Sequence, residues 1–584
     1  MLGAGSGSRL LAAPTVPGTE DKPRRQFAPR RQMNTEPRQT LDSDGPLVVA
    51  WFTVLFVLAI GVANGGSDQS VYLLQGIARA NPDFLAGDWF TWDTAPAHEA
   101  FGLLVALLSR LGILEIGLTL GAVLQSAVVA LSLYWGIRAV HDRPLVPWAL
   151  AALLLAAVGT RGIGLSRLIN PHMQASAIGG VCLLTGLVLL AWDKRLRAGL
   201  ALGIGGLFHA HFALLTLAVL LPLTVVESRP RRPFVVAVLL PFLALSSYNL
   251  LQATLYALSP ASAQSTAIAL ARFPHHLLPS SWSPASYAVF LSAILVGFGG
   301  WIARRPRPKP RLAWSLVFIF LIVVSSVVIG YLRVLDSVNL AFPWRLSTLV
   351  VLACIALGSA SLCAPEAFRL RTPLLVPAAT VAGLALVVAA SRVLPARVVA
   401  AAVTAMLVPA SILISRRLST SGGAATWTSR LPLVVITIGF IPAVVHGLEL
   451  SHVDFRPDHS ARNDLYAWVR TTAPKGEVFA VPPSWKEFRL VAERPILVDH
   501  KATPLNSRPD LVAWFDRLYD LTGIPPANNV EELDEAFFSL DCDRAAALRS
   551  RYGLRFVVRP ADRELPCGTA VYEDGRYSVF DLAP

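Results

Sequence analysis

Three aspartates directly after the first long apolar run are the residues best placed to do chemistry. Asp68, Asp83 and Asp88 lie in this segment, and His98 follows shortly after them. A carboxylate held at a membrane boundary can act as a general base on a hydroxyl or amine group, and it can also ligate a divalent metal ion. We therefore predict that Asp68, Asp88 and His98 are catalytic, with Asp68 as the base. Asp83 is predicted to lie at the surface.

Four further loops between apolar runs carry arginines and histidines. Arginine can hold a phosphate through two parallel hydrogen bonds. Ionisable groups at a membrane boundary are costly unless they pair with each other or line a wet cavity. The predicted substrate-binding residues are Arg161, Arg167, His172, His209, His211, Arg272, His275, Arg333 and Arg345. Ordinary loop solvation and ion pairs between helices are the alternative explanation for any one of these residues.

The cysteines form no metal-binding motif, because neither CxxC nor HExxH occurs in the chain. Zinc is therefore not expected, and the use of a divalent metal on the loop carboxylates stays open. Cys542 and Cys567 lie in the polar C-terminal region. An oxidising exterior would permit a disulfide between them, and two unpaired cysteines are the alternative.

The elements that must position these groups are membrane helices. Apolar residues make up 54% of the chain and charged residues only 15%. A hydrocarbon core about 30 Å thick needs about 20 helical residues to cross it, and each helix satisfies its own backbone in lipid. We predict a polytopic α-helical membrane protein with about thirteen spans. These are expected at residues 47–63, 116–137, 145–159, 174–192, 198–210, 212–226, 234–252, 286–303, 313–331, 346–363, 374–391, 398–415 and 431–448.

The distribution of Lys and Arg predicts the orientation in the membrane. With a cytoplasmic N-terminus, the cytoplasmic loops hold 18 Lys and Arg and the opposite loops nine, which is the bias expected for a cytoplasmic side. The prediction is a multi-pass protein of the inner (plasma) membrane whose C-terminal segment lies outside the cytoplasm. This pattern also explains much of the net charge of +13. A nucleic-acid partner is not expected, since no nucleic-acid motif accompanies the charge.

Three regions are predicted. Residues 1–45 read as a disordered cytoplasmic tail within which Met33 is an alternative start, residues 46–451 as the transmembrane domain, and residues 452–584 as an extracytoplasmic α/β domain. In the last region we expect helices at DLYAWVRTTA, RPDLVAWFDRLYDLTG and VEELDEAFFSLDCDRAAALRSRYG. Strands are expected at EVFAVP, RPILVDH and LRFVVRP, together with a hairpin that turns at Asp574-Gly575.

A charged stretch of the C-terminal domain is open to two interpretations. It contains Trp485 and Trp514 together with eight ionisable side chains: Lys486, Arg489, Arg494, Asp499, His500, Lys501, Arg508 and Arg517. One interpretation is a surface that binds an anionic substrate or docks onto the membrane loops. The other is a solvated surface with the tryptophans packed beneath it.

Several motifs resemble a known class of enzymes. The acidic loop after the first span, the short helix EAFGLLVALLSRLG, the paired short spans around HAH and the outer α/β domain resemble the GT-C class of membrane glycosyltransferases. That class includes protein O-mannosyltransferases, oligosaccharyltransferases and aminoarabinose transferases. DQSVYLLQGIARANPDFLAGDWF, GLFHAHFALL and FAVPPSWKEFRLVAERPILVDHKATP resemble a group of bacterial multi-pass proteins whose C-terminal region is classed as a domain of unknown function.

The resemblance implies that Asp68 occupies the position of the essential loop-one acid, although SDQS stands here where a paired acidic motif is usual. The predicted function is transfer of a sugar from a polyprenyl-phosphate donor to a cell-envelope acceptor on the outer face of the membrane. The expected partners are the lipid bilayer and a polyprenyl-phosphate-linked sugar. Two alternatives stay open, a non-catalytic envelope assembly protein and a transporter or flippase of a lipid-linked substrate.

Overall fold

The structure is a computed structural model. It describes residues 45–583 except for 67, 160–161, 228–230, 259–262, 305–308, 334–338, 364–394, 421–429, 456–459 and 527–528. Three features predicted from the sequence lie outside the described residues. They are residues 1–44 of the tail with Met33, the span at 374–391, and Arg161.

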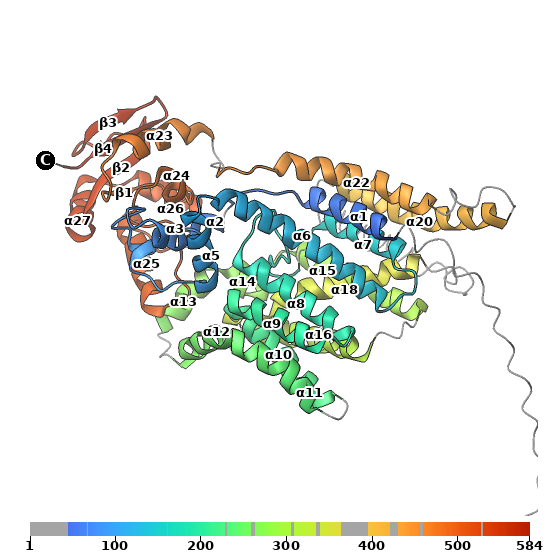
Figure 1. Cartoon of the computed structure of the whole chain (residues 1–584). Coiled ribbons are helices and arrows are strands. Elements are labelled where there is room, and N and C mark those ends of the chain that lie inside the picture. Colours follow the sequence, from blue (N-terminus) through green and yellow to red (C-terminus); the bar gives the residue numbers. More distant parts are fainter. Residues whose placement is uncertain are drawn as a thin grey trace, which may run out of the picture. The chain divides into compact units, whose positions relative to one another are not determined.

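Apolar helices dominate the described part of the chain (Figure 1). Six are long and apolar enough to cross a membrane: α6 (Leu114–Arg138), the segment of α11 (Arg232–Phe234), η1 (Val235–Leu239) and α12 (Leu240–Leu258), α16 (Pro310–Tyr331), η3 with α18 (Pro343–Leu346 and Ser347–Leu362), α20 (Ala396–Thr420) and α22 (Leu431–Leu450). Shorter apolar helices are α1 (Gly45–Ile60), α7 (Leu145–Val158), α8 (Ala175–Ala191), α10 (Ala210–Val226) and the stretch Ser286–Ile302 of α15 (Pro284–Arg304). The predicted polytopic helical class is confirmed, and the number of spans stays a prediction.

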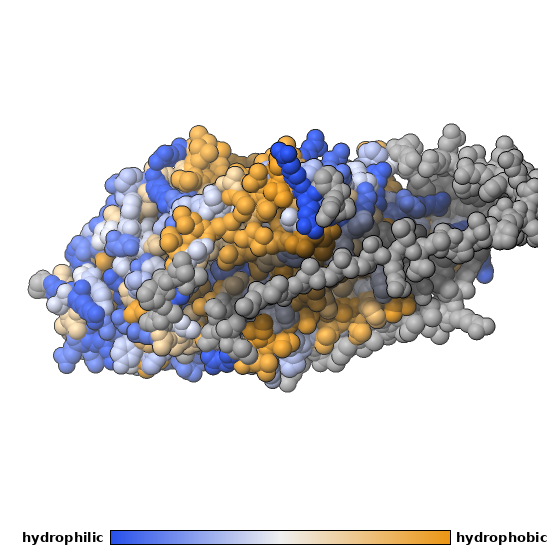
Figure 2. Space-filling model, turned by 90° about the horizontal axis from the view of Figure 1, so that it is seen from below, coloured by the Kyte–Doolittle hydropathy of each residue, from blue (hydrophilic) through white to orange (hydrophobic). Residues whose placement is uncertain are grey.

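These helices expose apolar side chains outward as well as inward, as a lipid-facing protein does. Leu120 and Leu124 on α6 are 62% and 63% exposed, and hydrophobic surface covers much of the helical part in Figure 2. Small residues let neighbouring helices approach closely. A Cβ added to Gly199 of α9 (Arg195–Phe208) would lie 2.6 Å from the carbonyl oxygen of Val238 in η1. Glycine is therefore required where α9 crosses η1.

One end of the helices carries an ionic network. Arg311 donates to both carboxylate oxygens of Glu227 at 2.6 and 2.8 Å, and it also pairs with Asp193. These residues belong to three separate loops that the sequence assigns to the cytoplasmic side. The network therefore places those three loops together.

Short helices link the spans away from this network. The first loop forms α2 (Gln69–Tyr72), α3 (Leu74–Ala80), α4 (Trp89–Trp92) and α5 (Glu99–Arg110), and α5 is the short helix predicted before the second span. Between α12 and α15 lie α13 (Ala263–Arg272), α14 (Pro274–Leu277) and the 3-10 turn η2 (Pro279–Ser281).

The C-terminal part is a small α/β domain, as predicted. Its sheet has the order β1-β2-β4-β3, with β1 parallel to β2 and the other pairs antiparallel. The strands are β1 (Val478–Ala480), β2 (Leu554–Pro560), β3 (Thr569–Glu573) and β4 (Tyr577–Asp581). The helices are η5 (Ser460–Arg462), α23 (Asn463–Thr472), α24 (Phe488–Ala492), α25 (Arg508–Thr522), α26 (Val530–Phe538) and α27 (Cys542–Tyr552).

Most local signals in this domain are confirmed. Gly523 ends α25 in the left-handed region at φ 75°, and Asp574 accepts backbone hydrogen bonds within the β3–β4 turn. Cys542 and Cys567 form a disulfide with Cα atoms 5.7 Å apart. The predicted strand RPILVDH is wrong, because only the bridge between Phe479 and Ile496 forms. The N–H of Ile496 donates to the Asp88 carboxylate instead, at 3.1 Å.

The C-terminal domain shares apolar cores with the loops beside it. Ile268 and Leu270 of α13 pack in one cluster with Trp514 and Leu518 of α25. In a second cluster, Ala502 packs with residues of α2, α3 and α5. Leu490 of α24 belongs to this second cluster, and Figure 1 shows α24 next to α3. Burial of this kind stabilises the docked arrangement by about 25 cal/mol per Å² of apolar surface removed from water.

Candidate functional site

Asp68 lies where the first loop meets the C-terminal domain. It is the residue before α2, and its Oδ1 atom is 2.7 Å from Nζ of Lys501. Both side chains are 34% exposed, so solvent reaches this ion pair. Burial alone would raise the pKa of Asp68, but the charge of Lys501 and its hydrogen bond hold the pKa below the ordinary value of 3.8. Asp68 is therefore a carboxylate at neutral pH.

Aromatic and basic side chains from three other elements form a cluster within electrostatic reach of Asp68. The ring of His98 stacks on His209 at 4.8 Å between centroids and meets Tyr72 edge-on at 4.7 Å. Arg345 of η3 contacts Nε2 of His209 at 3.2 Å. Burial and the charge of Arg345 lower the pKa of His98 to about 4, so His98 is neutral at neutral pH. The site thus combines neutral imidazoles with a permanent cation.

Two ring nitrogens in this cluster are buried without a hydrogen-bond partner in the described structure, Nδ1 of His98 and Nδ1 of His209. Arginine can only donate, so Nε2 of His209 accepts from Arg345 and neutral His209 carries its proton on Nδ1. Buried polar atoms of this kind are normally satisfied by water or a ligand. The cluster therefore presents groups able to bind a polar molecule.

Further histidines complete the site. His211 lies 5.3 Å from His209 between ring centroids, and His275 lies 4.3 Å from His276. His172 and His276 are within electrostatic reach of Asp68, and burial lowers the pKa of His276 to about 4. The structure therefore brings together most of the predicted histidines, although they lie in four separate loops of the sequence.

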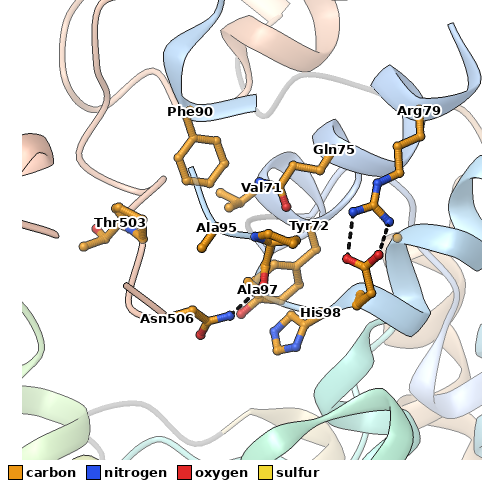
Figure 3. A pocket seen from close by; sticks show the side chains of 14 residues that line it. Val71, Tyr72, Gln75, Arg79, Phe90, Ala95, Ala97, His98, Thr503 and Asn506 are labelled. Atoms are coloured by element: carbon orange, nitrogen blue, oxygen red, sulfur yellow. Dashed lines mark hydrogen bonds and ion pairs between the residues drawn. The ribbon is translucent and has the colours of Figure 1, made fainter. Parts of the chain in front are cut away.

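A pocket adjoins this cluster between the first loop and the C-terminal domain (Figure 3). Tyr72, Gln75 and His98 line it from the first loop, and Asn506 lines it from the C-terminal domain. Asn506 donates to the carbonyl oxygen of Pro96 at 3.0 Å. At one side Arg79 and Glu99 form two parallel hydrogen bonds of 2.7 and 2.8 Å. The pocket thus offers amide and aromatic groups beside a neutral ion pair.

Asp88 and Arg272 are placed differently from their predictions. Asp88 is fully buried, caps α4 through Thr91 and pairs with Arg489 at 2.8 Å. Arg489 also pairs with Asp499, and Arg272 donates to the carbonyl oxygen of His500 at 2.8 and 3.1 Å. These contacts suit a structural role in which the loops hold the C-terminal domain. Asp88 and Arg272 therefore belong to this docking contact and not to the cluster around Asp68.

Two more predicted phosphate ligands lie at the surface. Arg167 and Arg333 are both exposed, and Arg167 contacts the side chain of Asn170 at 3.3 Å. Among the predicted arginines that the structure describes, Arg345 is the one inside the cluster. Asp83 is exposed, as predicted, and contacts Lys475 at 3.6 Å.

Several members of the site were not assigned from the sequence, among them Tyr72 and Lys501. Tyr72 follows Asp68 by one helical turn, so the i,i+4 spacing was the available signal. Lys501 was part of the charged C-terminal stretch, and its contact with Asp68 confirms that this stretch docks onto the membrane loops. Within the described ranges, no group of three or more His, Cys, Asp or Glu is arranged to hold a metal ion.

Comparison with known proteins identifies one family model. Residues 461–521 match DUF6798, a domain of unknown function, which confirms the predicted classification of the C-terminal region. No curated protein sequence matches the chain.

Solved structures give more extensive but distant similarities. The crystal structure of ArnT from Cupriavidus metallidurans bound to undecaprenyl phosphate shares 16% identity, with 93% of this chain and 99% of that chain covered and a TM-score of 0.48. The oligosaccharyltransferase AglB from Archaeoglobus fulgidus, in complex with an inhibitory peptide and a dolichol-phosphate, shares 13% identity. There 88% of this chain and 69% of that chain are covered, with a TM-score of 0.49. Both are GT-C glycosyltransferases. These similarities concern the fold alone and assign no role to any residue of this chain.

Proposed function

We propose that the protein is a membrane glycosyltransferase that moves a sugar from a polyprenyl-phosphate donor to a cell-envelope acceptor. The observation that carries this proposal is the cluster of Asp68, Lys501, Arg345 and neutral histidines where the apolar helices meet the C-terminal domain. A lipid-linked phosphosugar needs this combination of surroundings. Its tail requires lipid, its phosphate requires cations, and its sugar requires polar groups.

In the proposed reaction Asp68 is the general base. The acceptor hydroxyl attacks the anomeric carbon of the sugar, and the bond between that carbon and the phosphate oxygen breaks. The hydroxyl proton passes to Asp68, and polyprenyl phosphate leaves with the bonding electron pair. Arg345 stabilises the negative charge of the phosphate, and charge-assisted hydrogen bonds of this type contribute about 1.5–3 kcal/mol. Tyr72, Gln75 and Asn506 of the neighbouring pocket bind the polar part of a substrate.

The reaction is proposed to occur outside the cytoplasm. The Cys542–Cys567 disulfide supports this location, because disulfides persist in oxidising compartments. The excess of Lys and Arg in the opposite loops gives the same orientation. A reporter fused after residue 584 should be active only outside the cytoplasm, and one fused in RRPRPKPR only inside. Cytoplasmic activity of the C-terminal fusion would overturn the proposed orientation.

The proposal is tested by two aspartate variants in a reconstituted transfer assay. Asp68→Asn should reduce transfer by about 10²–10⁴-fold, the usual cost of removing a positioned base. Asp83→Asn is the matched control, because Asp83 lies in the same loop and also pairs with a lysine of the C-terminal domain, but at an exposed position. It should leave transfer nearly unchanged.

One observation favours a second function. Asp68 already contacts Lys501, so this ion pair could serve only to dock the C-terminal domain in a non-catalytic envelope assembly protein. Equal transfer by the Asp68→Asn and Asp83→Asn variants would favour that function.

A further inference from the structure

The backbone on both sides of Lys501 is held in place. Asp499 pairs with Arg489 and accepts a hydrogen bond of 2.6 Å from the backbone N–H of Ala502. The carbonyl oxygen of His500 accepts two hydrogen bonds from Arg272. The position of the loop therefore does not depend on the side chain of Lys501, whose four-carbon stem leaves its ammonium group free to change partner.

The exposure of the Lys501 ion pair also differs from that of the docking contact beside it. Arg489 and Asp88 are 1% and 0% exposed, whereas Lys501 and Asp68 are both 34% exposed. A solvated pair of this kind contributes only about 0–1 kcal/mol to stability. Its exchange for another partner is therefore cheap, and a ligand in the site can reach both groups.

A phosphate bound near Arg345 would compete with Asp68 for the ammonium group of Lys501. Its oxygens accept charge-assisted hydrogen bonds, for which lysine is a common donor in proteins. His98 and His276 are neutral at neutral pH, so they offer a phosphate no positive charge there. Lys501 is the cation already in contact with the proposed base.

We propose that Lys501 exchanges partners when the donor binds. In the unbound protein it pairs with Asp68, and the phosphate of the donor draws its ammonium group away, which frees Asp68 to accept a proton. The inference rests on the proposed function and assigns Lys501 as a donor-binding residue supplied by the C-terminal domain. Once Lys501 leaves, burial of Asp68 is no longer opposed by that charge, so the carboxylate becomes a stronger base when the donor is present.

The test measures binding of undecaprenyl phosphate to the full-length protein in lipid nanodiscs. Lys501→Met should weaken binding by about 10–100-fold, the equivalent of one charge-assisted hydrogen bond, and Lys501→Arg should restore most of the affinity. Asp68→Asn should tighten binding up to about fivefold, because it no longer competes for Lys501. This gain should be smaller in the Lys501→Met background. Lys475→Met and Asp83→Asn, the exposed pair, should leave the affinity unchanged.

The outcomes separate the inference from the proposed function. If the unaltered protein does not bind undecaprenyl phosphate, the polyprenyl-phosphate donor is wrong and the inference falls with it. If the protein binds but Lys501→Met has no effect, the inference alone is wrong. It is also wrong if Asp68→Asn tightens binding equally in both backgrounds, since Asp68 would then act by simple repulsion. A folding defect would not produce tighter binding by Asp68→Asn.

Discussion

Among the ionic contacts that join the first loop to the C-terminal domain, those of Asp88 and Asp68 differ in almost every physical respect. Asp88 and Asp499 both pair with the buried Arg489, and each carboxylate also accepts a hydrogen bond from a backbone N–H group. The contact of Asp68 with Lys501 is a single pair open to solvent. Removing one member of a buried set leaves an uncompensated charge, whereas removing one member of an open pair costs little.

This difference distinguishes a contact that holds the domain in place from a contact that is available for the proposed reaction. The buried contact holds the C-terminal domain against the loops, and the open contact lies beside the neutral histidines and Arg345 at the proposed site. Both contacts begin from aspartates of one loop that are only twenty residues apart. Residue type alone therefore does not distinguish the carboxylate proposed as the base from the structural one, and the surroundings of each do.

The largest effect on stability is expected at Arg489. Arg489→Met would leave Asp88 and Asp499 buried without a cation and should destabilise the docked domain by about 3–5 kcal/mol. Limited proteolysis and thermal unfolding of the purified protein would measure this loss. Lys475→Met is the control, because its ion pair is exposed, and it should change stability by less than about 1 kcal/mol. Equal stability of the two variants would erase the distinction between the contacts.

The disulfide should also stabilise the C-terminal domain, by a smaller free energy than the contacts of Arg489. Cys542→Ser should lower the stability of this domain by about 2–4 kcal/mol, as measured by thermal unfolding. In the native protein, Cys542 and Cys567 should resist alkylation until a reductant is added. Alkylation of both residues in the untreated protein would contradict the pairing and remove one support for the extracytoplasmic location.

At the site around Asp68 and Lys501, loss of Arg345 should weaken phosphate binding more than loss of the other predicted phosphate ligands. Arg345→Met should weaken binding of undecaprenyl phosphate about 10–100-fold, because its guanidinium lies within the cluster. Arg333→Met and Arg167→Met should have no more than a severalfold effect, since both side chains are exposed. A larger loss in either exposed variant than in Arg345→Met would move the phosphate site away from His209.

The smallest effect concerns pH. The pKa of Asp68 lies below 3.8 in the folded protein, so its pairing with Lys501 contributes stability above that value and loses it as the pH falls through the lower folded-state pKa. The stability difference between the unaltered protein and Lys501→Met should thus stay constant from pH 7 to pH 5. It should disappear only below about pH 4, and it should not exceed about 1 kcal/mol. A difference that vanished near pH 6 would indicate that a histidine, not Asp68, is the partner.

The sequence predicts the membrane class and most of the C-terminal elements because those signals are local. Apolar runs give the helices, and Gly523 and the Asp574-Gly575 turn lie where their spacing indicates. The predicted strand around Ile496 forms only one bridge to β1, through Pro495 and Leu497, and the N–H of Ile496 donates to Asp88, which is about four hundred residues away in the chain. No local pattern carries that information.

The site was predictable only in part for the same reason. Charge bias indicated that the loops with His98, His209 and His275 share one side of the membrane. The structure places these loops together, since His98 stacks on His209, and His211 and His276 both contact Phe342. Which arginine enters the cluster depends on packing. Arg345 lies over the ring of Phe342, whereas Arg272 donates to the carbonyl oxygen of His500. The pairing of Asp68 with Lys501 likewise follows from how the C-terminal domain docks.

The most direct test of the proposed site is an experimental structure in lipid nanodiscs with undecaprenyl phosphate added. We expect density for the phosphate next to Arg345, with the ammonium group of Lys501 turned towards it and away from Asp68. The polyprenyl chain should leave the site between apolar helices. A lipid phosphate bound elsewhere, with Lys501 still on Asp68, would contradict the assignment of this cluster as the donor site.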